Sequence, residues 1–292
     1  MNHRQVSEQI QCMMPGQPIY PALLKEIRDY PKELFYIGKP DVLNENCVSI
    51  VGSRKTNQYG RSTAFAFGKK LGQQSVTVVS GMAVGIDTCA HEGALQGNGK
   101  TAAVLACGLD ICYPMQNREL KKKIEECGIL LSEYPPGTRA QRYYFPQRNR
   151  IISGLSPLTV VIQAGNRSGA LITAETAADQ GREVAAVPGN IDSEYNLGSN
   201  KLLREGALPL SGIQDLLEAA GVSSLSESEV KKLLSEEEQR LYALLCSHGE
   251  LSLDQLSVYL GKPVNEVGNM AIVMEMKGVV FSAMGKIFIA KD

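Results

Sequence analysis

The sequence of 292 residues predicts a doubly wound α/β domain followed by a smaller module of a different kind. Three observations support this fold class. Six short apolar runs between about residues 47 and 187 lack strict polar alternation, which is typical of strands buried on both faces of a mostly parallel sheet. Helix-compatible segments separate most of these runs. After residue 220 the composition changes to a small, polar stretch that indicates a linker.

The expected elements of the first domain alternate strand and helix at the spacing of a doubly wound sheet. The expected strands are Val48–Val51, Val76–Ser80, Thr101–Ala106, Ile129–Glu133, Leu158–Ala164 and Glu183–Val187, with Leu208–Ser211 as a possible edge strand. The expected helices include Gly60–Gln73, Ile86–Gln96, Ala170–Gln180 and Ile213–Ala220. We therefore assign residues 47–220 to this domain, and the less regular residues 1–46 to a short N-terminal segment.

Residues 221–234 are assigned to the linker and residues 235–292 to a small winged-helix domain. Ser235 and Glu238 have the spacing of a capping box, which predicts a helix through about Cys246. The remaining expected elements are helices at Leu253–Leu260 and Pro263–Met276, and two strands within Gly278–Ala290. Three helices and a β-hairpin in about 60 residues are the pattern on which this assignment rests.

Composition excludes several classes of protein. No stretch approaches the roughly 20 apolar residues of a membrane-spanning helix, and the first 20 residues lack the apolar core of a signal peptide. The seven cysteines form no CxxC pair, which favours reduced thiols in a cytoplasmic protein. With only three histidines, no metal site is expected.

The net charge of −1 argues at first against a nucleic-acid binder. Residues 225–292, however, contain seven Lys/Arg and ten Asp/Glu, a net charge of −3, so residues 1–224 carry +2. The third helix of the C-terminal module, the usual DNA reader of such modules, contains no Lys or Arg before residue 277. For this module we therefore favour a protein-contact or dimer-supporting role over DNA binding.

Glycine follows every one of the six main strands, at the edge where a doubly wound sheet binds ligands. Glycine permits close approach of the backbone to a ligand, and helix N-termini favour anions. Tight turns in α/β proteins also need glycine, so one such loop means little. Because Arg54, Lys55 and Arg167 lie in these loops, six of them at one edge favour an anionic ligand.

The segment Arg139–Gly154, RAQRYYFPQRNRIISG, is the most informative. Its first twelve residues hold four arginines and no acid, with Tyr143, Tyr144 and Phe145 among them. Guanidinium groups neutralise phosphates and aromatic rings stack on unpaired bases, which indicates single-stranded nucleic acid. The alternative is a solvated loop whose aromatic side chains fill the core.

Motifs of other functions are weak or absent. The sequence has no GxGxxG after the first strand, and Gly99-Lys100-Thr101 precedes a strand where a P-loop would follow one. No GxSxG motif of serine hydrolases is present. Asp87 and His91 share a helix face, as a structural pair or, less simply, as a catalytic dyad.

Several ordered motifs resemble the DprA/Smf family over about residues 20–220. They are Val51-Gly52-Ser53-Arg54, Ser80-Gly81-Met82-Ala83-Val84-Gly85-Ile86-Asp87, Gly108-Leu109-Asp110, Phe145-Pro146-Gln147-Arg148-Asn149-Arg150-Ile151-Ile152-Ser153, Ser168-Gly169-Ala170-Leu171-Ile172-Thr173-Ala174 and Pro188-Gly189-Asn190. The resemblance implies an extended Rossmann-like core that binds single-stranded DNA and forms homodimers. It further implies protection of incoming single strands in natural transformation, loading of the RecA recombinase, and a C-terminal winged helix.

The same resemblance implies a set of DNA-binding residues: Gly52, Ser53, Arg54, Ser80, Gly81, Phe145, Arg148, Asn149, Arg150, Ser168, Gly169 and, more weakly, Lys201. Because binding breaks no bond, no enzyme activity and no cofactor are expected. The chain departs from the family at two places. Val84 stands where many relatives have arginine, and the N-terminal segment is too short for the complete N-terminal domain of many relatives.

A rival hypothesis comes from distant relatives of this core that cleave the N-glycosidic bond of nucleoside monophosphates. Their PGGxGTxxE motif corresponds here to AGNRSGALITAE, with Glu175 where a catalytic carboxylate would stand. The second glycine and the Gly-Thr step of the motif are missing, so this hypothesis ranks second.

Overall fold

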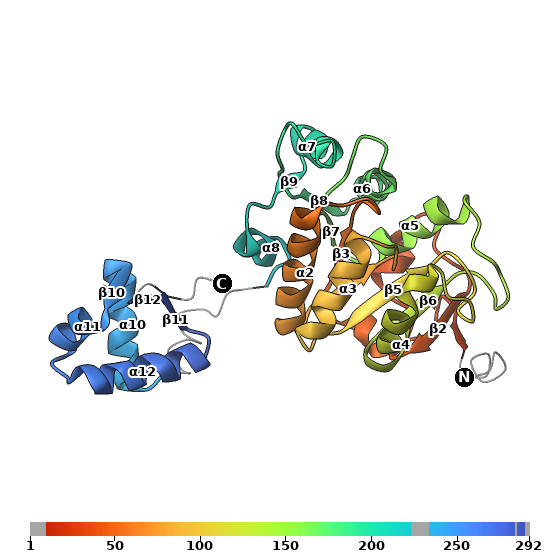
Figure 1. Ribbon diagram of the computed structural model, residues 1–292. Helices are drawn as coiled ribbons and strands as arrows, with labels where there is room; N and C mark the ends of the chain where they lie inside the picture. Colours follow the sequence, from red (N-terminus) through yellow and green to blue (C-terminus); the bar gives the residue numbers. More distant parts are fainter. Residues whose placement is uncertain (1–9, 223–233, 284, 290–292) are drawn as a thin grey trace. The chain divides into compact units, whose positions relative to one another are not determined.

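The computed structural model describes residues 10–222, 234–283 and 285–289. The chain divides into two compact units, Met1–Ala220 and Gly221–Asp292, each with an apolar core of its own (Figure 1).

In the described part of the first unit, nine strands form one sheet in the order β1-β2-β6-β5-β4-β3-β7-β8-β9. The strands are β1 (Gln11–Met13), β2 (Leu34–Gly38), β3 (Cys47–Val51), β4 (Thr77–Ser80), β5 (Thr101–Leu105), β6 (Ile129–Ser132), β7 (Leu158–Val161), β8 (Glu183–Ala186) and β9 (Leu208–Pro209). All neighbouring pairs from β6 to β9 are parallel, whereas β2 runs antiparallel to β6 and β1 antiparallel to β2.

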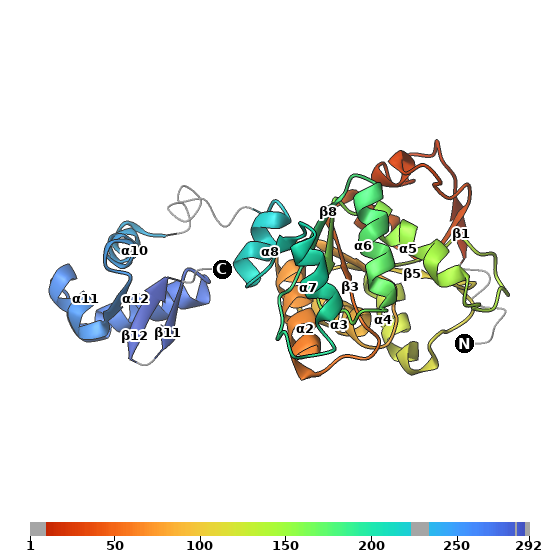
Figure 2. The ribbon, with the colours of Figure 1, turned by 90° about the horizontal axis from the view of Figure 1, so that it is seen from above.

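Helices cover both faces of this sheet. They are α2 (Gln58–Gln73), α3 (Ile86–Gln96), α4 (Arg118–Cys127), α5 (Tyr144–Gly154), α6 (Gly169–Asp179), α7 (Leu197–Arg204) and α8 (Ile213–Ala219). Figure 2 shows α2, α3 and α4 on one side of the strands and α5 and α6 on the other. The strands are accordingly apolar on both faces: in β6, Leu131 packs with Ile151 of α5, while Leu130 packs with Ile124 of α4.

The strand order reverses between β3 and β7. From β3 the chain adds β4, β5 and β6 on one side, and after α5 it returns to place β7 on the other side of β3. Ligands of doubly wound sheets bind at such a switch point, outside the carboxyl ends of the strands. The topology alone therefore directs attention to the loops that follow β3 and β7.

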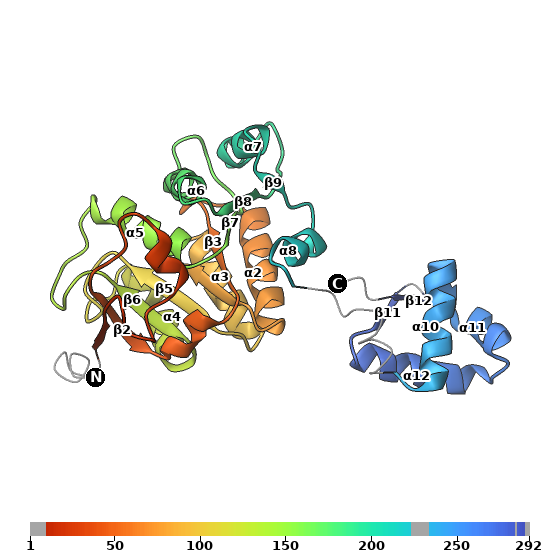
Figure 3. The same cartoon turned by 180° about the vertical axis from the view of Figure 1, so that it is seen from behind.

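The structure confirms the predicted fold class, and strand positions agree within a few residues. It differs at the N-terminus. Residues assigned to a separate segment contribute β1 and β2 to the sheet, and the short helix η1 (Leu23–Glu26) packs against α5 (Figure 3). This part was not assigned to the domain because β2 pairs antiparallel with β6 and has no βα alternation to reveal it.

The second unit contains α10 (Glu236–His248), β10 (Glu250–Ser252), α11 (Leu253–Leu260), α12 (Val264–Met276), β11 (Val280–Ala283) and β12 (Lys286–Ile289). Its three strands form an antiparallel sheet in the order β10-β12-β11. The capping box of Ser235 and Glu238 is formed in both directions. The helices lie where the sequence predicts them, and the winged-helix assignment stays a prediction.

None of the helices in the described residues has the length and apolar character needed to cross a membrane. Within the same residues, no group of three or more His, Cys, Asp or Glu side chains is placed to hold a metal ion.

Candidate nucleic-acid interface

A cavity of about 650 Å³ lies at the switch point of the sheet. The loops after β3, β4, β7 and β8 contribute to its walls, together with one side of α5 and the first turn of α6. Eight of the twelve residues implied by the family motifs line it: Gly52, Ser53, Arg54, Phe145, Arg148, Asn149, Ser168 and Gly169.

Three exposed cations line this cavity. Arg54 and Lys55 come from the loop after β3, and Arg167 from the loop after β7. Within the described part of the chain, no acidic side chain forms an ion pair with any of the three. Their positive charge is therefore available to an anion that enters the cavity.

Phe145 presents an aromatic ring beside these cations. The Arg54 guanidinium carbon lies 4.7 Å from the centre of the ring, a cation–π arrangement that holds both groups in place. The ring also lies beside Tyr113, with a centroid separation of 5.6 Å and an angle of 51° between the two ring planes. Phe145 and Arg54 also line a second cavity of about 160 Å³ that includes Gly81 and Val84. An aromatic ring next to free cations can stack on an unpaired base while the cations bind phosphate.

Arg148 has a different place from the one expected of a phosphate ligand. Its side chain lines the cavity, but the residue is only 4% exposed, and its Nη1 donates to the carbonyls of Gly81 (2.8 Å) and Val104. Burial lowers the pKa of Arg148 to about 10, which leaves it charged at neutral pH, and Asp87 favours the charged form. The guanidinium thus ties α5 to the ends of β4 and β5.

Asp87 and His91 do not form a dyad. The Asp87 carboxylate accepts hydrogen bonds from the backbone N–H groups of Gly81 (3.2 Å) and Ala83 (3.3 Å). Burial raises the pKa of Asp87, and Arg148 opposes this shift. The His91 Nδ1 atom lies 2.6 Å from Thr101 Oγ1. Each side chain is engaged elsewhere, which supports structural roles.

Glycine at two of the predicted positions serves internal packing. A Cβ atom at Gly52 would lie 2.5 Å from Ile86 Cγ1, and one at Gly81 would lie 2.5 to 2.7 Å from the Arg148 guanidinium. At Gly169, in contrast, no atom lies within 4 Å of that position. The loops are thus rich in glycine partly because helices and arginine pack closely on the sheet, as well as for access to the cavity.

The N-terminus of α6 opens onto the cavity. Ser168 is its N-cap, and its hydroxyl accepts a hydrogen bond from the Ala170 N–H (3.3 Å). Asn149 of α5 reaches across with its Nδ2 atom 3.5 Å from the Gly169 carbonyl. The positive end of the α6 dipole therefore adds to the attraction for an anion.

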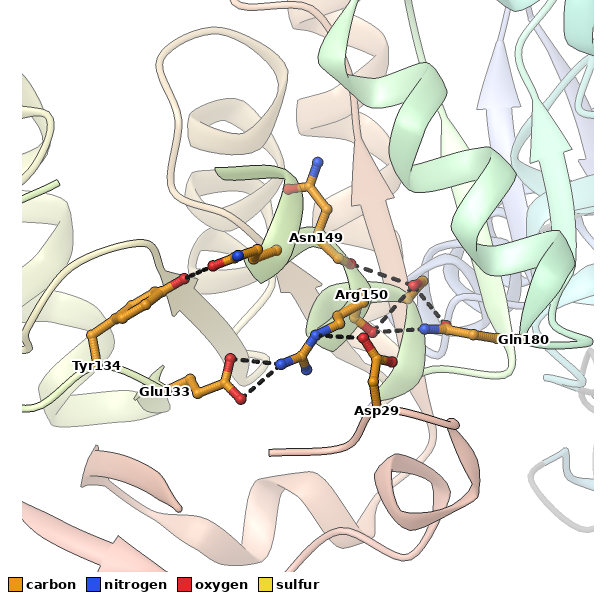
Figure 4. Close-up of polar contacts among 8 residues, drawn as sticks. Asp29, Glu133, Tyr134, Asn149, Arg150 and Gln180 are labelled. Atoms are coloured by element: carbon orange, nitrogen blue, oxygen red, sulfur yellow. Dashed lines mark hydrogen bonds and ion pairs between the residues drawn. The ribbon is translucent and has the colours of Figure 1, made fainter. Parts of the chain in front are cut away.

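Arg150 lies apart from the cavity-lining residues. Its Nη2 donates to both carboxylate oxygens of Glu133 at 2.7 Å, and its Nε lies 3.0 Å from Asp29 Oδ2 (Figure 4). The side chain is 15% exposed. The structure therefore uses Arg150 to fasten α5 to the loop after β6 and to the N-terminal segment.

Two further predicted residues also lie outside both cavities. Ser80 is buried and donates from its hydroxyl to the Ile50 carbonyl at 2.6 Å. Lys201, on α7, pairs with Glu205 at 3.5 Å.

The four arginines between residues 139 and 150 do not act as one basic surface. Arg139 and Arg142 are exposed, but neither lines either of the two cavities. Arg148 and Arg150, on α5, make contacts inside the protein.

A family comparison gives the decisive observation. The family model described as "DNA recombination-mediator protein A" matches residues 11–221, which include the whole nine-stranded sheet and every residue of the cavity. The chain belongs to the DNA recombination-mediator protein A family. The match begins at β1, so the family region includes the antiparallel strands that the sequence patterns did not assign to the domain.

Named members of the family are similar over most of this chain. DNA processing protein DprA of Streptococcus pneumoniae is 43% identical over 198 residues, 68% of this chain and 70% of the relative. Protein Smf of Synechocystis is 39% identical over 234 residues; the match covers 78% of this chain but only 59% of that longer relative. Protein Smf of Escherichia coli is 36% identical over 275 residues, 91% of this chain and 74% of its own length.

Solved structures of family members share the fold. The X-ray structure of S. pneumoniae DprA has a TM-score of 0.69 and 40% identity, covering 74% of this chain and 76% of its own. A structure of DprA from Helicobacter pylori has a TM-score of 0.66 and 28% identity, covering 72% of this chain and 94% of its own. That study describes a single-stranded DNA binding mode for the H. pylori protein.

The family motifs did not indicate one side of the cavity. Tyr195 comes from the loop after β8, Leu197 is the first residue of α7, and Ile172 lies in the first turn of α6. Ile172 belongs to the motif at residues 168–174, but nothing in that pattern showed that its side chain lines a cavity. Glu175, one turn further along α6, is exposed and does not line the cavity.

Proposed function

We propose that this chain binds single-stranded DNA in the cavity at the carboxyl ends of β3 and β7. The observation that carries the proposal is the meeting in one cavity of the Phe145 ring with three cations that have no acidic partner among the described residues: Arg54, Lys55 and Arg167. Phosphates need the cations, and an aromatic ring can stack only on a base that is not paired in a duplex. Family membership and the single-stranded DNA binding mode of the H. pylori relative support it.

The biological role proposed with this activity is that of a recombination mediator. The chain would protect single-stranded DNA and promote its loading with the RecA recombinase in DNA processing and natural transformation. We further propose that it works in the cytoplasm as a homodimer through its first unit, and that it performs no catalysis. The family description supports a mediator role, and the finer statements extend it.

Filter binding of labelled oligonucleotides tests the binding proposal. The double variant Arg54→Ala, Arg167→Ala removes two of the three cations and should lose most of its affinity for a single strand. The slope of log affinity against log salt should also fall by about 1.4, since each phosphate contact on a single strand contributes about 0.7. Duplex DNA of equal length should bind more weakly to the unaltered chain.

A matched control removes two cations from elsewhere on the same unit. Arg118 and Lys123 are exposed on α4 and do not line either cavity. The double variant Arg118→Ala, Lys123→Ala should keep its affinity within about twofold. Equal losses of affinity in the two double variants would mean that binding depends on net charge alone. That result would contradict a binding site in the cavity.

The rival glycosidase hypothesis has a direct test. The exposed position of Glu175, outside the cavity, gives it no access to a nucleotide held there. Incubation of the chain with nucleoside monophosphates should release no free base. Release that disappears in Glu175→Gln would establish the rival activity.

A further inference from the structure

The walls of the main cavity differ in chemistry along the sheet. Arg54 and Lys55 follow β3, Arg167 follows the neighbouring β7, and Glu194, Tyr195 and Leu197 follow β8, one strand further along. The cations thus occupy the β3–β7 side. On the β8 side, within the lining described, the side chains carry no positive charge.

Two aliphatic side chains face the solvent on that second side. Ile172 is 43% exposed and Leu197 is 42% exposed, although both line the cavity. Single exposed apolar residues are ordinary on protein surfaces. Here two of them converge with the half-buried Tyr195 on a cavity whose opposite side is cationic. Such a surface stays partly exposed to water until a flat apolar ligand covers it.

We propose that the cavity binds the phosphate and the base of a nucleotide on different sides. Arg54 and Lys55 bind the phosphate, and the apolar wall formed by Ile172, Tyr195 and Leu197 takes the face of the attached base. A strand would then lie across the cavity with its backbone towards β3 and a base towards β8. This inference rests on the proposed single-stranded DNA binding and assigns a role to three residues outside the motif-derived set.

The acidic side chain on the same wall agrees with this arrangement. Glu194 is exposed and lines the cavity, and among the described residues no cation forms an ion pair with it. A carboxylate beside a bound phosphate would weaken binding, since like charges repel. Its presence on the β8 side therefore directs the phosphate away from that side and towards Arg54 and Lys55.

Fluorescence anisotropy with two oligonucleotides of equal length tests the proposal on the full chain. One is oligothymidylate, and the other carries the same sugar-phosphate backbone without bases. The double variant Ile172→Ser, Leu197→Ser should bind oligothymidylate about tenfold more weakly, in the range of one lost base contact. Its affinity for the abasic strand and its salt dependence should not change, because neither side chain contacts phosphate.

Two control variants distinguish the loss of a base contact from a general disturbance of the protein surface. Val258→Ser removes an aliphatic side chain that is 82% exposed in the second unit, and should leave both affinities unchanged. Ile172→Leu with Leu197→Met keeps the wall apolar and should keep the affinity for oligothymidylate. Circular dichroism and the melting temperature show whether each variant is folded.

The possible outcomes distinguish the two proposals. If the unaltered chain binds no oligothymidylate, the proposed function fails and the base wall fails with it. If the unaltered chain binds but the serine variant binds equally well, only the base wall is overturned. It is overturned likewise if the serine variant loses as much affinity for the abasic strand as for oligothymidylate.

Discussion

Gly81 and Gly169 each line a cavity, but the space around their Cα atoms differs. The Cβ atom of an alanine at 81 would lie 2.5 Å from Arg148 Nη2, and that guanidinium cannot move aside because it is buried and bonded to two carbonyls. At 169 the corresponding space is open. The family motifs contain both glycines without distinguishing them. The structure shows that close packing requires glycine at 81, whereas Gly169 borders open space.

The first prediction follows from this difference. Gly81→Ala should lower the free energy of unfolding by about 1–3 kcal/mol, the usual range for overpacking a buried site. Gly169→Ala should change it by less than about 0.5 kcal/mol, as for an unobstructed surface position. Urea unfolding of the two variants beside the unaltered chain measures both. A Gly81→Ala variant as stable as Gly169→Ala would mean that Arg148 is not fixed where the structure has it.

His91 is the second residue whose environment has a measurable consequence. It is fully buried on α3, and burial lowers its pKa to about 3. The Thr101 hydroxyl donates to the Val78 carbonyl, so we assign the proton between His91 and Thr101 to His91 Nδ1. The ring is therefore neutral in the folded chain over most of the pH range.

The pH dependence has a definite sign. The folded pKa of His91 lies below its unfolded value of about 6.5, so its contribution to stability is complete above pH 6.5. It falls as the pH decreases from about 6.5 towards 3, by up to about 1.4 kcal/mol for each pH unit, because only the unfolded chain takes up the proton. In His91→Asn this component should be absent. Urea unfolding between pH 7 and pH 5 tests the difference, and identical pH profiles would contradict it.

Helix α5 shows that two arginines of one motif can make entirely different contacts. Positions two apart on a helix do not share a face, so Arg148 and Arg150 must point in different directions. Arg148 reaches the carbonyls at the ends of β4 and β5, and Arg150 reaches Glu133 and Asp29. The sequence shows only an arginine-rich run. The packing of α5 determines which carbonyl or carboxylate groups each guanidinium contacts.

Arg150 is therefore expected to act on the stability of the helix. Arg150→Met should lower the free energy of unfolding by about 2 kcal/mol, the range for hydrogen bonds to charged groups. Affinity for single-stranded DNA, measured by anisotropy at a temperature where the variant is fully folded, should stay within about twofold. Figure 4 shows the contacts that the variant removes.

A double-mutant cycle checks the attribution. Glu133→Gln leaves Arg150 its contact with Asp29 but weakens the two-pronged contact, so the two substitutions together should cost less than their sum. The alternative outcome, a loss of DNA affinity at unchanged stability, would return Arg150 to the role that the family motif implied.

At the scale of elements, hydrophobic periodicity predicted the amphipathic helices and the buried strands that alternate with helices along the chain. Ile86–Gln96 and Leu253–Leu260 were predicted to the residue. β1 and β2 were not predicted, because they pair antiparallel and the connection between Met13 and Leu34 contains the 3₁₀ helix η1 in place of the α-helix that marks a βα unit. The sheet edge that carries the cavity was predictable from glycine positions. The apolar wall was not, since it combines residues from α6, from the loop after β8 and from the start of α7.

At the scale of the whole molecule, the near-neutral net charge conceals an uneven distribution. Residues 225–292 carry −3 and residues 1–224 carry +2. Three cations without an acidic partner in the described part of the chain, Arg54, Lys55 and Arg167, line one cavity. Six other described cations of the first unit form ion pairs: Lys100, Lys121, Lys122, Arg150, Arg182 and Lys201. A local potential of this kind governs binding more than the total charge does.

The two units differ in core as well as in charge, and this leads to the last prediction. The first unit contains the complete sheet and all residues of the cavity, and the second has an apolar core of its own. A chain that ends after residue 224 should therefore unfold in one cooperative transition, as compact single domains do. It should bind a single strand at 150 mM salt with an affinity within about threefold of the full chain, because every residue of the cavity lies in the first unit and salt at this concentration screens charges beyond about 8 Å.

At low salt the same truncation should behave differently. Removing a net charge of −3 leaves a positively charged remainder, so at about 10 mM salt, where screening extends to roughly 30 Å, the truncated chain should bind more tightly than the full chain. Anisotropy titrations of both chains across this range give the comparison. A truncated chain that binds weakly at every salt concentration would show that the acidic unit takes part in holding the strand, and its α12 helix, which has no Lys or Arg, would then need a contact other than phosphate neutralisation.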